Sequence, residues 1–104
     1  MAENEDVTTV VLPSVLDLKA VGPLHQTFLS ARGTPVDVNA SEVTRLGGLG
    51  LQLLLSARAT WVNDGLPFRV SAPSEDFNAA LALFGAQDLT AADAKEMHLS
   101  LIHI

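Results

Sequence analysis

Short runs of β-branched residues alternate along the chain with longer stretches whose apolar positions recur every three or four residues. Residues 7–12 are β-branched except for Leu12, and the run stops at Pro13, which is typical of a strand. Val21, Leu24 and Phe28 follow helical spacing. Repeated along the chain, this alternation predicts an α/β fold: a small, mostly parallel or mixed sheet of about four strands with helices packed on it.

Residues 14–18 are ambiguous, because they fit either a second short strand or a turn. Proline is tolerated in the first turn of a helix, so the first helix is expected to begin just before Pro23 and to stop at Gly33. The other expected elements are strands at residues 35–39 and 68–72, a helix that runs to about Asn63, and a helix from about Ser74 to Gly85 with a buried stripe of Phe77, Ala80, Leu81 and Phe84.

The long helix that ends near Asn63 carries two apolar stripes. A helix needs one stripe to cover a sheet, so the second stripe is expected to meet another molecule. Trp61, the single tryptophan, is expected to be half-buried against the sheet. The first stripe is Leu51, Leu54, Leu55 and Val62, and the second is Leu49, Leu53 and Ala57.

Length and composition fit one globular domain. The chain has 104 residues, of which 48% are hydrophobic and 17% charged, which favours a packed core over disorder. Its expected divisions are a flexible acidic leader (residues 1–6), one domain (residues 7–89) and a C-terminal extension (residues 90–104), in which residues 97–104 alternate weakly like a strand.

Net charge excludes some classes of partner. The charge is −6, and the six lysines and arginines are scattered, so no basic patch is expected for nucleic acid or for an anionic membrane surface. The start of the chain has no basic and apolar run of a secretory signal, and the most apolar window is too short to span a bilayer. We therefore expect a cytoplasmic protein without direct membrane insertion.

Catalytic, metal and cofactor sites are not expected. With no cysteine and three dispersed histidines (His25, His98 and His103), the chain offers no converging metal ligands, and His25 is expected on a helix surface. Asp37 is expected near the end of a strand, where α/β proteins often place function, although a solvated turn residue is the favoured interpretation.

The glycine-rich turn at residues 47–50 has a second interpretation. Its backbone suggests a phosphate cradle, but Leu51 and Gln52 stand where a P-loop has its lysine and hydroxyl residue. Close packing of the helix start on the sheet is favoured, and nucleotide binding stays open as a function of another class.

Residues 36–55, Val-Asp-Val-Asn-Ala-Ser-Glu-Val-Thr-Arg-Leu-Gly-Gly-Leu-Gly-Leu-Gln-Leu-Leu-Leu, resemble the signature of the STAS domain family. That signature is a strand, a turn, a short apolar stretch, and Asp-Ser/Thr-x-Gly-Leu at the start of a leucine-rich helix. The likeness extends over residues 7–89, including the strand near Phe68 and the last helix. It implies a non-catalytic module that binds another protein.

One position departs from the family pattern. Placing Gly50 and Leu51 on the Gly-Leu of the signature puts Gly47 on the aspartate and Gly48 on the Ser/Thr. In antagonists of anti-sigma factors, that hydroxyl residue is the phosphorylated switch. Gly48 has no hydroxyl, so no phosphorylation is expected at this position.

The resemblance also implies where a partner binds and which partners to consider. The partners are a bacterial anti-sigma kinase, a chemotaxis-related signalling protein, or the ATPase of a lipid-transporting ABC system; a homodimer is an additional possibility. The expected contact residues lie in the turn before the long helix and on its first two turns: Arg45, Gly47, Gly48, Leu49, Gly50, Gln52, Leu53 and Ser56.

Overall fold

The computed structural model describes residues 7–90. The expected leader and residues 91–104, which include the alternating run at 97–104, lie outside the described residues. The elements are β1 (Thr8–Val11), β2 (Val15–Leu16), α1 (Leu18–Ala31), β3 (Val36–Asn39), β4 (Arg45–Leu46), α2 (Gly48–Asn63), β5 (Phe68–Ser71), α3 (Glu75–Phe84) and the 3-10 turn η2 (Gln87–Thr90).

The strands confirm the expected α/β fold, but they form two separate sheets instead of one. They form a three-stranded sheet in the order β1-β3-β5 and a separate pair, β2-β4, and every pairing is parallel. The sequence prediction missed β4, because two residues are too short to show an alternating pattern. Backbone pairing with the ambiguous segment creates β4: the N–H groups of Thr44 and Arg45 both donate to Ser14 O.

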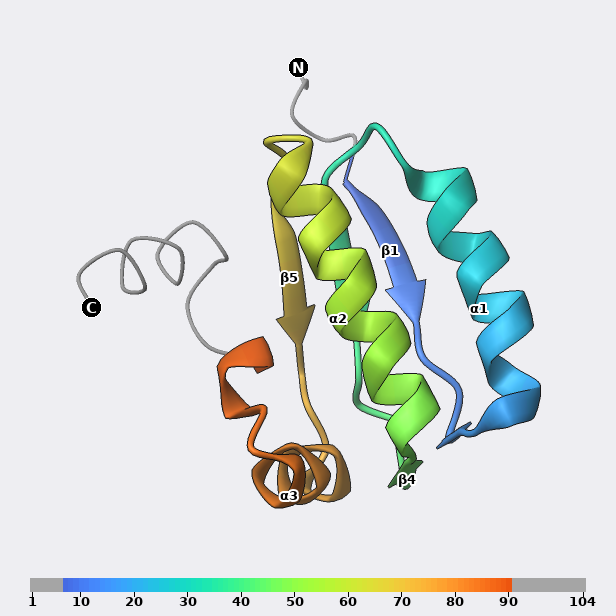
Figure 1. Ribbon diagram of the computed structural model, residues 1–104, viewed down its shortest axis with the longest axis vertical. Coiled ribbons are helices and arrows are strands. Elements are labelled where there is room, and N and C mark those ends of the chain that lie inside the picture. The colour runs from blue at the N-terminus through green and yellow to red at the C-terminus, as the bar shows by residue number, and fades with distance from the viewer. Residues whose placement is uncertain (1–6, 91–104) are drawn as a thin grey trace.

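Helices α1 and α2 lie side by side and pack on one face of the sheet (Figure 1). The Phe68 ring lies 6.1 Å from both Phe28 of α1 and Trp61 of α2, measured between ring centroids. Trp61 is 2% exposed, so the expected half-burial was wrong. The indole N–H of Trp61 can be buried without loss because Nε1 donates a hydrogen bond to Thr34 O at 2.7 Å.

The first helix begins five residues before Pro23, at Leu18, so the expected start was wrong. Asp17 caps it, with a carboxylate oxygen accepting from the N–H groups of Lys19 and Ala20. Pro23 therefore lies inside the helix. The residue before it is Gly22, whose missing Cβ relieves the clash that proline causes with its predecessor.

The last helix lies beyond the carboxyl ends of the strands (Figure 1). Ser74 caps its start and Gly85 ends it in a left-handed conformation, as expected. Phe77 and Leu81 are buried, but Phe84 is 47% exposed, so its place in the buried stripe was wrong. The chain turns back at Gly85, and Ala86 occupies the core position instead, with its N–H donating to Leu81 O.

Candidate functional site

Backbone hydrogen bonds fix the turn that leads into α2. Ser14 O accepts from the N–H of Thr44 at 2.7 Å and from its side-chain hydroxyl at 3.0 Å. Two residues after Ser14, Leu16 O accepts a hydrogen bond from Gly47 N–H at 3.0 Å. The small β2-β4 pair thus holds the start of α2 in a defined position.

A second tether joins this turn to α3. The Ser74 hydroxyl donates to Val43 O at 2.6 Å and accepts from Phe77 N–H at 3.0 Å. Ser74 N–H also donates to Ala40 O. One serine therefore caps α3 and ties it to the segment before β4.

The glycines at the start of α2 have different roles. A Cβ on Gly50 would lie 2.9 Å from Leu16 Cβ, so a glycine is needed for α2 to approach β2. A Cβ on Gly48 would meet nothing within 4 Å. Gly50 is buried and Gly48 is exposed. The close-packing interpretation of the turn is therefore confirmed at Gly50, where a side chain has no room.

The expected contact residues form a surface along the first turns of α2 and the residues before it. Leu49 is 51% exposed, although Leu51 and Leu54 on the same helix are buried. The boundary between the two stripes differs from the expected one, because Ala57 is buried and Val62 is exposed. We define the corner surface as the accessible members: Arg45, Gly48, Leu49, Gln52 and Ser56, which are exposed, and Gly47 and Leu53, which are half-buried.

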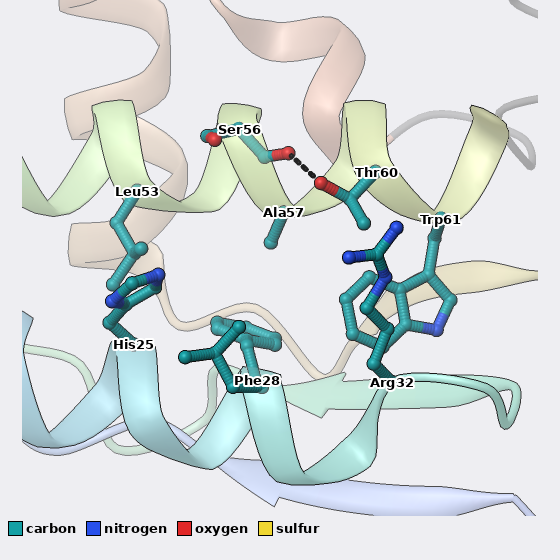
Figure 2. A pocket seen from close by; sticks show the side chains of 9 residues that line it. His25, Phe28, Arg32, Leu53, Ser56, Ala57, Thr60 and Trp61 are labelled. Carbon is teal, nitrogen blue, oxygen red and sulfur yellow. Dashed lines mark hydrogen bonds between the residues drawn. The ribbon is translucent and has the colours of Figure 1, made fainter. Parts of the chain in front are cut away.

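The corner surface borders a shallow hollow of about 70 Å³ between α1 and α2 (Figure 2). Leu53 of α2 and His25 of α1, which is exposed as expected, line it, and Phe28, Ala57 and Trp61 line it as well. Leu53 is half-buried because it packs against the core from this hollow.

The far end of the hollow carries an exposed ion pair. Arg32 Nε lies 3.1 Å from Asp64 Oδ2. The hydrogen bond from the guanidinium to Asp64, reinforced by the attraction between the charges, raises the pKa of Arg32. This pair links the end of α1 to the residue that caps α2.

The start of α2 is electropositive. No side chain caps its first N–H groups, since the cap residue is Gly47, and no acidic residue lies in its first turn. The helix dipole places partial positive charge here, and Arg45 is exposed just before it. This end of α2 therefore favours an acceptor or acidic group on whatever binds it.

Other chemistry has little support in residues 7–90. They contain no group of three or more histidine, aspartate or glutamate side chains that could hold a metal ion. Asp37 lies within β3, and its Oδ1 atom is buried with no hydrogen-bond partner in this range, so the favoured interpretation of a solvated turn residue was wrong. None of the helices in this range is long and apolar enough to cross a membrane.

Comparison with known proteins agrees with the fold. A family model described as "Mlab, STAS domain" matches residues 1–98, which is nearly the whole chain. No curated protein matches the sequence. The match confirms the likeness seen at residues 36–55 and accounts for the order of strands and helices. The chain belongs to the STAS domain family.

Proposed function

We propose that this protein is a non-catalytic regulatory module that binds a partner protein through the corner surface. The observation that carries the proposal is the exposed Leu49 on a helix whose core-facing side is already complete. Protein interfaces commonly have an apolar centre and a polar rim, and Leu49 with the exposed polar side chains around it fits that arrangement.

The first candidate partner is a bacterial signalling protein, either an anti-sigma kinase or a chemotaxis-related protein. In such a system this chain acts without the usual switch, because Gly48 offers no hydroxyl to phosphorylate. Binding is then governed by the amount of partner and not by a phosphate at this position. The proposal places the protein in the cytoplasm.

The same glycine favours a second candidate partner, the ATPase of a lipid-transporting ABC system. A subunit that remains bound to an ATPase needs no phosphorylation cycle and therefore no hydroxyl at the start of α2. Both candidates use the corner surface, and they differ only in the protein that binds it.

A capture experiment with matched variants tests the proposal. Each purified candidate partner is titrated with wild type, Leu49→Asp and Leu83→Asp. Leu83 is the control because it is also an exposed helical leucine but lies on α3. We expect Leu49→Asp to lose binding at least tenfold and Leu83→Asp to retain it, with both variants folded by circular dichroism.

A second variant examines the start of the helix. Gly48→Asp has space for its side chain, and an acidic residue in the first turn is compatible with the helix dipole. We expect it to fold normally and to block the acceptor group of the partner. If Leu49→Asp and Gly48→Asp both bind like wild type, the corner surface is not the interface. Stoichiometric heat on titration with a nucleotide would favour the nucleotide-binding alternative.

A further inference from the structure

The face of the sheet opposite α1 and α2 carries mostly polar side chains in a regular arrangement. The side chains that alternate with the core residues form two rows across the strands: Thr9, Asp37 and Arg69, then Val11, Asn39 and Ser71. Thr9, Val11 and Arg69 are exposed. Parallel sheets are usually covered on both faces, so the side chains that stay exposed on this face in the described part of the chain offer a surface for another molecule.

Asp37 provides the chemical evidence for that occupant. It stands beside Arg69 in the register of β3 and β5, yet no ion pair or hydrogen bond joins the two among residues 7–90. Its Oδ1 atom is buried and has no hydrogen-bond partner within the described part of the chain. A shielded carboxylate oxygen without a donor is costly, and a cation on a molecule that covers the face removes that cost.

The rows are complementary to themselves. A two-fold axis that runs parallel to the strands, between β3 and β5, lays β3 of one copy over β5 of the other and keeps each row opposite itself. Asp37 then faces Arg69 of the second copy, and Asn39 faces Ser71. Two oppositely charged pairs and two amide–hydroxyl pairs result, in the aligned sheet-on-sheet geometry that proteins commonly use.

We propose that this outer face is a contact between two copies of the chain, held by reciprocal Asp37–Arg69 pairs. The overlap of two four-residue strands is far smaller than the roughly 800 Å² per partner of a standard stable interface. Self-association is therefore weak and needs high protein concentration. The corner surface lies on β4, the start of α2 and the residue between them, so the proposed partner site and this contact are separate.

Charge reversal tests the contact by sedimentation equilibrium over a series of increasing concentrations. Asp37→Arg places two arginines opposite each other twice, and Arg69→Asp does the same with two aspartates. We expect each variant alone to self-associate at least roughly tenfold more weakly than wild type, because like charges oppose contact. An equimolar mixture of the two variants restores both pairs, so we expect it to associate as wild type does.

Recovery of association in the mixture would show that the charges pair between two chains, because within each variant residues 37 and 69 carry the same charge. Lys19→Asp is the control: Lys19 is exposed on α1, outside both proposed surfaces, and its substitution changes the net charge as Arg69→Asp does, so it should associate like wild type. Wild type that remains a single copy at every concentration would overturn the proposal and leave the face to a different molecule. Single variants that still associate, or a mixture that does not, would also overturn it. None of these results depends on binding at the corner surface.

Discussion

Gly50 on α2 packs directly against Leu16 on β2, and the contact leaves no room for a side chain on residue 50. A Cβ on Gly50 would lie 2.9 Å from both the Cβ and the carbonyl oxygen of Leu16. The contact sets how near the start of α2 lies to the β2-β4 pair. It therefore also positions the exposed residues next to it in the sequence.

Substitution of Gly50 by alanine is expected to destabilise the protein by about 1–3 kcal/mol, because the new methyl group overpacks a contact with backbone. Gly48→Ala is the matched control, since its Cβ meets open space. Alanine has the higher helix propensity, so Gly48→Ala should be neutral or up to about 1 kcal/mol more stable. Urea unfolding of the two variants measures the difference, and equal stabilities would contradict the close contact.

Trp61→Phe is expected to lower the free energy of unfolding by about 1–3 kcal/mol. It removes the hydrogen bond to Thr34 O and leaves part of the indole volume empty. Leu83→Ala serves as the control, because Leu83 is 85% exposed and little is lost there. Thermal unfolding followed by circular dichroism gives both values. A loss no greater than that of the control would show that the bond to Thr34 contributes nothing.

The Ser74 hydroxyl makes two bonds, and two substitutions separate them. Ser74→Ala loses both the cap and the tether and should cost about 1–2 kcal/mol. Ser74→Asp still accepts from Phe77 N–H but has no hydroxyl to donate to Val43 O. We expect its stability to fall below that of wild type, because the tether is lost. Ser30→Ala, an exposed serine on α1, is the control for loss of a hydroxyl. Chemical denaturation that finds Ser74→Asp as stable as wild type would remove any role for the tether.

Pro23→Ala should make the protein more stable. Proline lacks the N–H that would bond within α1, and its ring crowds the carbonyl oxygen four residues earlier. Relief of that cost is partly offset, by about 0.4–1 kcal/mol, because alanine leaves the unfolded chain more flexible. Differential scanning calorimetry should show a higher Tm. A lower Tm would mean that packing around Pro23 outweighs the missing bond.

Local sequence patterns predicted most elements of the fold but not how each meets the core. Strand β3 was predictable because Val36 and Val38 alternate with Asp37, and α3 because Ser74 and Gly85 are strong end signals. The existence of β4 depends on a backbone partner thirty residues earlier, Val15, which no local pattern contains.

The candidate site was predictable to a similar degree. The family pattern identified the glycine turn, and the excess of leucines predicted an exposed stripe that includes Leu49. The sequence alone did not distinguish Gly50, which is buried against Leu16, from Gly48, which is exposed. That difference depends on how α2 packs on β2. The full burial of Trp61 also depends on a distant acceptor, Thr34 O.

Every strand pair of the described fold joins segments that are 28 to 32 residues apart, as in Thr8 with Val36 and Val36 with Phe68. No hairpin is present among these strands to serve as a local nucleus, so each pairing requires closure of a loop that contains a whole helix. Folding is therefore expected to be slower than for a helical bundle of equal length. A fragment that stops before Phe68 lacks the third strand and much of the surface on which both helices pack.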